Sequence, residues 1–183
     1  MKKNYVIVHG SFGSPFENWF SWIRKEIPEV LIPTFPIGVG KQNYENWKLV
    51  LECYKKLGYI NKTTTLIGHS IAPIFLIHYL LEHQLHVKKL VFISGFNKFS
   101  VDEGGEYDTV NASFFCDHIE KIKDYAEEIV CFYSDNDPYV SYDALKDFAT
   151  RVSTKEILIS DAGHFNTESG YVTFPQLIDE LRN

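Results

Sequence analysis

Short apolar runs alternate along the chain with longer stretches in which apolar residues recur every three or four positions. The short runs are rich in Val, Ile, Leu and Phe and end near Gly, Pro, Asn or Asp, so each predicts a strand. They span residues 5–8, 30–32, 64–67, 89–93, 129–133 and 156–159. The longer stretches predict helices at residues 15–26, 43–57, 114–125, 142–152 and 174–181, with a further helix directly after the run at 64–67.

This alternation predicts an α/β fold. Strands separated by helices pair in parallel through right-handed crossovers, and the helices then cover both faces of the sheet. We therefore expect a three-layer α/β/α sandwich around a mostly parallel six-stranded sheet. The chain has 183 residues, with no internal repeat and no linker, which favours a single domain over residues 1–183. The long aromatic and acidic connection at residues 95–127 is expected to form a lid over a site.

The clearest motif follows the apolar run at 64–67. The sequence Gly68-His69-Ser70-Ile71-Ala72 has the form Gly-x-Ser-x-Gly with Ala in the last place. A strand that turns at once into a helix forces the serine into a strained conformation, so the residues two before and two after it must be small. We interpret Ser70 as the nucleophile of such an elbow; the alternative is that Ser70 only caps the helix.

Composition excludes several classes of partner. Hydrophobic residues make up 45% of the chain, which indicates a packed globular protein. The net charge is −6, so the chain lacks the positive field that binding to nucleic acids or anionic membranes requires. No apolar stretch has the length of a signal peptide or a membrane span. The three cysteines include no Cys-x-x-Cys pair, so we expect reduced thiols with buried packing roles in a cytoplasmic protein.

Candidate catalytic groups follow several of the predicted strands. In a sheet of this type ligands bind outside the carboxyl ends of the strands. Those ends deliver Ser70, then Asp137 after the run at 129–133, then His164 after the last run. The order Ser, Asp, His is that of an α/β-hydrolase. His164 would take the serine proton, and Asp137 would orient the imidazole. Asp135 is the alternative acid, although it could simply cap its turn.

The tetrahedral oxyanion of such a reaction needs backbone donors. We expect these to be the amides of Ile71, which follows the nucleophile, and of Ser11, in the glycine-rich loop after the first strand. Phe12 is the neighbouring alternative to Ser11. His9 is expected to shape this loop and His69 to be structural. The histidines lack the spacing of a metal site and no phosphate-binding loop is present, so we expect no metal and no cofactor.

Aromatic residues near these loops could form an acyl pocket, although aromatic residues at helical spacing are more often core. We expect Phe12, Phe16 and Phe165 to line it. Further candidates are Trp19, Phe96, Phe99 and Tyr139.

The stretches VIVHGSFGSPFENWFSWI, LIGHSIA, SDNDPYV and AGHFN resemble the small serine hydrolases typified by retinoblastoma-binding protein nine and its bacterial relatives. The likeness covers nearly the whole chain. It implies a compact α/β-hydrolase fold lacking the first two strands of larger members, and it carries the family's triad onto Ser70, Asp137 and His164. The Leu-x-Cys-x-Glu motif of the vertebrate namesake has Lys55 in its last place here, so its protein partner is not expected.

The hypothesis from the sequence is therefore a serine hydrolase that cleaves a small or medium ester, with an amide as the alternative substrate, through an acyl-serine intermediate. Its expected partner is a small-molecule substrate. The rival hypothesis is a protein-interaction module on a hydrolase scaffold with little turnover, because fold alone does not fix function. An intact triad and elbow favour the enzyme.

Overall fold

The computed structural model describes residues 4–98 and 105–182. Its centre is one sheet of five parallel strands in the spatial order β1-β2-β3-β4-β5. The strands are β1 (Asn4–Val8), β2 (Thr64–His69), β3 (Val87–Ile93), β4 (Ala126–Tyr133) and β5 (Lys155–Leu158). Because all five run in the same direction, the loops that follow them gather at one edge of the sheet, where the candidate catalytic residues were expected.

The predicted strand at residues 30–32 does not form, so the count of six strands was wrong. Leu31 alone pairs with the sheet, as an isolated parallel bridge to Val6. The Leu31 amide donates to the Tyr5 carbonyl (2.8 Å), and the Leu31 carbonyl accepts from Ile7 (2.8 Å). Pro33 follows two residues later and has no amide hydrogen to continue the ladder, which ends the pairing at this outer edge.

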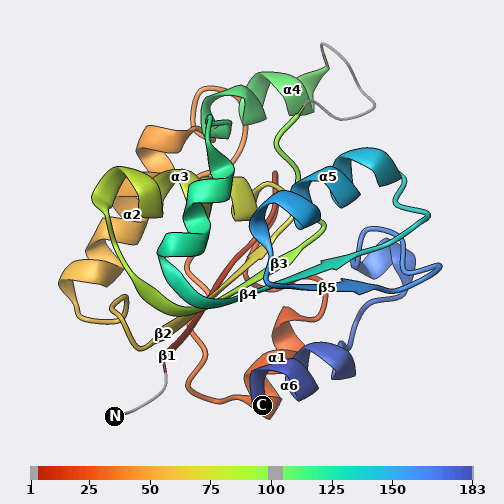
Figure 1. The fold of residues 1–183 in the computed structure, drawn as a ribbon, viewed down its shortest axis with the longest axis horizontal. Helices are drawn as coiled ribbons and strands as arrows, with labels where there is room; N and C mark the ends of the chain where they lie inside the picture. Colours follow the sequence, from red (N-terminus) through yellow and green to blue (C-terminus); the bar gives the residue numbers. More distant parts are fainter. Residues whose placement is uncertain (1–3, 99–104, 183) are drawn as a thin grey trace.

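Helices cover both faces of the sheet, which confirms the three-layer α/β/α architecture (Figure 1). One face carries α2 (Tyr44–Lys56), α3 (Ala72–His83) and α5 (Tyr142–Val152), and the opposite face carries α1 (Phe20–Glu26) and α6 (Pro175–Arg182). Successive strand residues supply the two cores in turn. In β3, for example, Leu90 and Phe92 pack against the first layer, whereas Val91 and Ile93 pack against the second.

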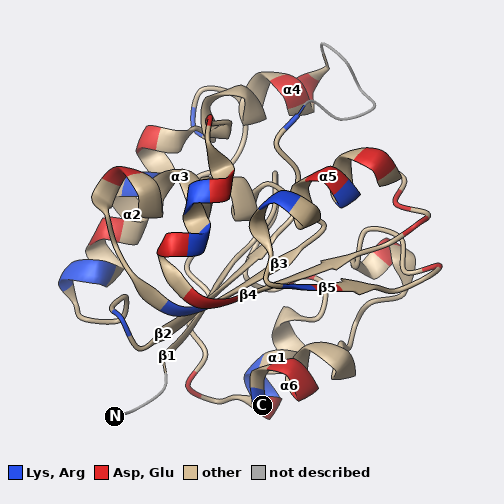
Figure 2. Cartoon of the chain, viewed as in Figure 1, with Lys and Arg blue, Asp and Glu red and all other residues tan. Residues whose placement is uncertain are grey.

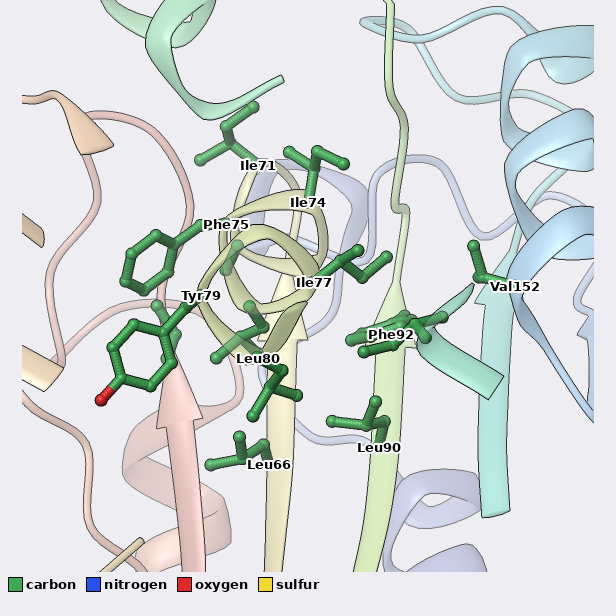
Figure 3. Packing of buried hydrophobic residues seen from close by; sticks show 14 of the residues in the cluster. Leu66, Ile71, Ile74, Phe75, Ile77, Tyr79, Leu80, Leu90, Phe92 and Val152 are labelled. Carbon is green, nitrogen blue, oxygen red and sulfur yellow. The ribbon is translucent and has the colours of Figure 1, made fainter. Parts of the chain in front are cut away.

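Helix α3 is the most deeply buried of the helices. Eight of its twelve residues are buried, as expected for a helix that covers the middle of a parallel sheet. Figure 3 shows Ile77 of α3 directed toward Phe92 of β3, while Phe75 and Tyr79 point to the other side of the helix. Phe75 meets Trp47 of α2 with ring centroids 5.3 Å apart. This packing fixes the helix that begins two residues after Ser70.

The connection between β3 and β4 differs from the single helix predicted at 114–125. It contains α4 (Glu106–Asn111) and two short 3₁₀ segments, η1 (Ala112–Phe114) and η2 (Ile119–Asp124). His118 has a left-handed φ of +57° and separates the two segments, so one continuous helix cannot form. Residues 99–104 of the predicted lid, including Phe99, lie outside the described residues.

Charged side chains lie mainly on the outside of the fold. Figure 2 shows Lys, Arg, Asp and Glu mainly on the outer helices and loops, with the central strands largely free of them. All three cysteines are free; Cys131 is buried, but Cys53 is exposed on α2, so the expected packing role fails there. Within residues 4–98 and 105–182, no helix combines the length and the apolar character needed to cross a membrane.

Candidate active site

Ser70 lies at a sharp turn between β2 and α3. Its φ angle is +64°, a left-handed conformation that a residue with a side chain adopts only where the surrounding structure imposes it. The Ser70 amide donates to the Ile93 carbonyl at the end of β3 (2.9 Å), which ties the turn to the sheet. Helix α3 begins two residues later and has Pro73 in its first turn. The turn therefore has the strand–turn–helix geometry of a nucleophile elbow.

Two glycines make room for this turn. A Cβ atom at Gly68 would lie 2.8 Å from the backbone nitrogen of Pro73, so any larger residue would collide with the start of α3. A Cβ atom at Gly10 would lie 2.9 Å from the Cβ of Ser70. The first glycine explains the small residue two positions before the serine. The second lets the loop after β1 approach the nucleophile closely.

A pocket of about 530 Å³ lies at the loops that follow the strands, a volume suited to a small ligand. Ser70 and His164 both line it, together with Gly10 and Ser11. Among the hydrogen bonds of the described residues there is none between Ser70 and His164. A nucleophile–base contact of this kind often tightens only in the substrate complex, so its absence does not disqualify the pair.

His164 is held by Asp137. The His164 Nδ1 atom lies 2.6 Å from Oδ2 of Asp137, and both side chains are buried. The other carboxylate oxygen, Oδ1, accepts from the amides of Tyr139 (2.9 Å) and Val140 (3.1 Å). Burial alone would raise the pKa of Asp137, but the hydrogen bond and charge of His164 and the two amides outweigh it and lower that pKa. An ionised Asp137 fixes the Nδ1–H tautomer of His164, which leaves Nε2 without a proton and able to accept one.

Asp135, the alternative acid, serves a different purpose. Its carboxylate is exposed and accepts from the backbone of the loop that carries His164. Two neighbouring side chains act in the same way, so three consecutive amides of the histidine loop donate to three consecutive side chains of the acid loop. The pairs are Asp161 with Asp135 (2.9 Å), Ala162 with Ser134 (3.0 Å) and Gly163 with Asn136 (2.7 Å). Sequence reasoning missed Ser134 and Asn136, although the run Ser-Asp-Asn-Asp is a signal of such capping.

Two further buried histidines support the site. His69 Nε2 lies 2.8 Å from the carbonyl of His164 and must donate to it, and burial lowers the pKa of His69 to about 3, with the nearby His164 adding to the effect. His9 accepts from the Phe35 amide (3.2 Å) through Nε2 and donates to the Gly10 carbonyl (2.9 Å) through Nδ1. Burial likewise lowers the pKa of His9. Both imidazoles are therefore neutral supports of the loops, as expected from the sequence.

Of the two candidate oxyanion donors, Ser11 lines the pocket, and Ile71 directly follows Ser70, which also lines it. The amides of Ile71 and Ser11 donate to no described residue. The amide of Phe12, the alternative donor, is already bonded to Oε1 of the buried Gln42 (2.9 Å). The geometry therefore favours Ser11 over Phe12. Gln42 is a residue that sequence reasoning did not find, because no local pattern relates it to the loop after β1.

The aromatic residues lie differently from the prediction. Phe165 is fully buried in the core beside Phe174, Phe16 is 74% exposed, and Phe12 packs its ring against Tyr107 without lining the pocket. Trp19 is also in the core. Of the further candidates, Phe96 and Tyr139 do line the pocket, and the structure adds Tyr107.

Two carboxylates complete the pocket wall. Glu17 faces it from the loop after β1, and burial raises the pKa of this residue. Glu168 faces it from beyond His164 and accepts from the Tyr139 hydroxyl (2.5 Å). No lysine or arginine of the described residues lines the pocket. Over the same part of the chain, no cluster of three or more His, Cys, Asp or Glu side chains is arranged to hold a metal ion.

A parallel sheet with helices on both faces, an elbow serine after β2, and an Asp–His pair supplied by the loops after β4 and β5 define an α/β-hydrolase fold with a serine-hydrolase type of site. The sequence profile of a family described as serine hydrolase matches residues 5–183, and the chain belongs to that family.

Individual relatives agree with this assignment. The chain is 25% identical to the Bacillus subtilis protein YdeN, over 99% of this chain and 95% of YdeN. It is 27% identical to the serine hydrolase RBBP9 of Rattus norvegicus, over 89% and 88% of the two chains. The crystal structure of the B. subtilis ydeN gene product superimposes with a TM-score of 0.85 at 24% identity, covering 100% of this chain and 97% of that one. The resemblance inferred from the sequence is confirmed.

Proposed function

We propose that this chain hydrolyses a small or medium ester, with an amide as the alternative substrate, through an acyl-serine intermediate formed on Ser70. The observation that carries the proposal is the shared pocket of a strained elbow serine and a buried histidine whose Nδ1 is held by an ionised carboxylate. Each part alone has a structural explanation. Together, at one edge of one sheet, they match what nucleophilic catalysis by serine requires.

The proposed reaction has two stages, acylation of Ser70 and hydrolysis of the acyl-serine, and the same residues act in both. His164 Nε2 takes the proton of the Ser70 hydroxyl as Oγ forms a bond to the ester carbonyl carbon. The carbonyl oxygen becomes an oxyanion that the amides of Ser11 and Ile71 would bind. Collapse of this intermediate breaks the bond to the alkoxy oxygen, which leaves with the histidine proton. Water then repeats the sequence on the acyl-serine and releases the carboxylic acid.

The charge of the pocket constrains the substrate. Its wall carries the carboxylates Glu17 and Glu168 and no described lysine or arginine. A carboxylate or phosphate on the substrate would meet like charge in a partly desolvated site. Aromatic side chains of Phe96, Tyr107 and Tyr139 supply apolar wall. Neutral esters are therefore the substrates that we expect.

Part of the connection between β3 and β4 would act as the lid. Phe96 at its beginning and Tyr107 and Asn111 on α4 all line the pocket, so the segment forms one wall of the site. The three free thiols also support a cytoplasmic location.

The test is labelling of the purified protein with a fluorophosphonate probe, which reacts only with an activated serine. We expect wild type to label, Ser70→Ala to lose labelling completely, and His164→Ala to label far more slowly. Ser141→Ala is a matched control, because this serine only caps α5 on the surface. A folded wild type that remains unlabelled would contradict the proposal and favour the interaction module instead.

A further inference from the structure

A chain of hydrogen bonds on the oxyanion side of the pocket ends in a side chain that neither the sequence motif nor the triad accounts for. It begins at the amide of Phe12, runs through Gln42 and reaches Asn111 at the end of α4. Gln42 and Asn111 are 2% and 5% exposed, so neither is a surface residue in accidental contact. Buried amide groups of this kind are normally fully paired.

The donors fix the orientation of both carboxamides. A backbone N–H can only donate, so the atom of Gln42 that faces the Phe12 amide at 2.9 Å is its oxygen. The NH₂ group of Gln42 is then on the other side and donates to Oδ1 of Asn111 (3.0 Å). The Ser11 hydroxyl donates to the same Oδ1 (2.6 Å). The usual ambiguity between oxygen and nitrogen in an amide side chain is therefore resolved at Asn111.

The consequence concerns the remaining atom, Nδ2 of Asn111. With Oδ1 occupied by two donors, Nδ2 must point away from Ser11 and Gln42. Nδ2 donates to no described residue. It is also not one of the fully buried side-chain atoms without a hydrogen-bond partner, so it is accessible to solvent. Asn111 also lines the pocket. An amide NH₂ of an otherwise buried side chain is thus presented to the pocket beside Ser11, the residue whose backbone amide we assign to the oxyanion.

We propose that Asn111 is a catalytic residue whose Nδ2–H donates a hydrogen bond to a substrate oxygen at the reacting carbonyl, as a third donor beside the amides of Ser11 and Ile71. This inference rests on the proposed function and deepens it, because it brings α4 into the catalytic machinery. This role would also restrict the substrate, because the acyl group must bind with its carbonyl oxygen within reach of Asn111 on α4. The Gln42 side chain is a positioning residue in this scheme, because it orients the Asn111 amide.

The test separates the donor from the acceptor of Asn111. Asn111→Asp keeps an oxygen for Ser11 and Gln42 but removes the NH₂ group, and Asn111→Ala removes both. Thr109→Ala is the matched control, because Thr109 lies on the exposed face of the same helix and bonds only to Gly105. Each protein is assayed for p-nitrophenyl butyrate hydrolysis and for inhibition by n-butylboronic acid, which places an oxygen where the oxyanion forms. Thermal unfolding checks that each variant is folded.

We expect both Asn111 variants to lower kcat by about 10- to 100-fold with KM nearly unchanged, and to weaken boronic acid inhibition by a similar factor. Thr109→Ala should match wild type. In a crystal structure of the wild-type boronic acid adduct, Nδ2 should lie within about 3.2 Å of an adduct oxygen. This last readout does not depend on how any variant folds.

Two results would overturn the inference while leaving the hydrolase intact: near-normal kcat in Asn111→Asp, which would show that only the acceptor matters, or an adduct with Nδ2 beyond hydrogen-bond distance of every adduct oxygen. Failure of the proposed function looks different. A wild type that neither hydrolyses the ester nor binds the boronic acid would overturn the function and the inference together.

Discussion

The site has two halves that are built in different ways. The acid–base half consists of the loops at residues 134–138 and 159–166, which follow the adjacent strands β4 and β5. Side chains of the first loop accept from consecutive amides of the second, so the two loops of this half are bonded directly to each other. The proposed oxyanion half consists of Ser11, Phe12, Gln42, Ile71 and Asn111. Its side-chain bonds join segments up to 100 residues apart.

This difference shows which half of the site depends on the placement of α4. The acid–base half has its two short loops brought together by the sheet and bonded directly to each other, with further donors to its second loop from His69 and Trp19. The oxyanion half needs α4 in place, because Oδ1 of Asn111 accepts hydrogen bonds from both the Ser11 hydroxyl and the Gln42 side chain. Movement of α4 would break the bond between Asn111 and Ser11 and leave the His164–Asp137 pair intact. We therefore expect a ligand that displaces α4 to weaken transition-state stabilisation before it affects proton transfer.

The largest effect is expected from breaking the acid–base half at Asp137. In Asp137→Asn the side-chain oxygen can still accept from Tyr139 and Val140, so the NH₂ group faces His164 and favours the wrong imidazole tautomer. We expect kcat/KM for p-nitrophenyl butyrate to fall by about 10³- to 10⁴-fold.

Asp135→Asn is the matched control for that change. Asp135 bonds the backbone of Asp161 and does not touch the histidine. Its variant should retain activity within about threefold of wild type. Equal losses in the two variants would contradict the assignment of Asp137 as the acid.

A smaller effect is expected from the support under the acid–base half. His69 has an ordinary pKa of 6.5 that falls to about 3 in the folded protein because of burial. Below pH 6.5 the unfolded chain takes up a proton at His69 that the folded chain refuses until about pH 3, so acid favours unfolding over this window. The free energy of unfolding therefore carries no penalty from His69 above pH 6.5, and it decreases as the pH falls from 6.5 toward 3.

His69→Gln removes this titration and keeps a side-chain donor for the His164 carbonyl. Between pH 7 and pH 4.5 we expect wild type to lose about 2 kcal/mol more unfolding free energy than the variant, measured by urea denaturation. His9 titrates in both proteins and so cancels. Parallel losses in the two proteins would show that His69 is not the group responsible.

The smallest effect is expected from the oxyanion half at Gln42. Gln42→Ala leaves the Phe12 amide without its acceptor and frees the loop to rotate, so we expect kcat to fall by about tenfold while the acid–base half is untouched. Asn46→Ala is a suitable control, because it removes a comparable bond to Lys41 at the surface next to Gln42. Unchanged kcat in Gln42→Ala would show that the loop after β1 holds its shape without the link through Gln42 to Asn111 of α4.

The same division explains what could be predicted from the sequence. The strand–elbow–helix around Ser70 is visible because its steric demands fall on adjacent residues, such as Gly68 against Pro73. Asp137 and His164 are visible because each follows an apolar strand run. The hydrogen-bonding role of Gln42 and Asn111 was not visible, because it depends on three-dimensional contacts over large sequence separations that no local pattern records.

The errors have physical causes of the same kind. Leu31 has strand composition, yet Pro33 and its place at the outer edge limit it to one bridge. Phe165 follows the histidine in sequence, but its left-handed φ of +52° accompanies a side chain turned into the core rather than into the pocket. The aromatic residues of the sequence therefore indicated where the pocket lies, but the backbone conformation at each residue determines which of their rings face it.

The central claim is that Ser70 forms a covalent acyl intermediate. Wild-type protein mixed with p-nitrophenyl butyrate should release a burst of nitrophenol close to one equivalent wherever deacylation is the slower half. Acid quenching followed by peptide mass spectrometry should then locate a butyryl group on Ser70 and on no other residue. Hydrolysis with no butyryl-Ser70 peptide, or an acyl group found elsewhere while Ser70→Ala remains active, would contradict the account.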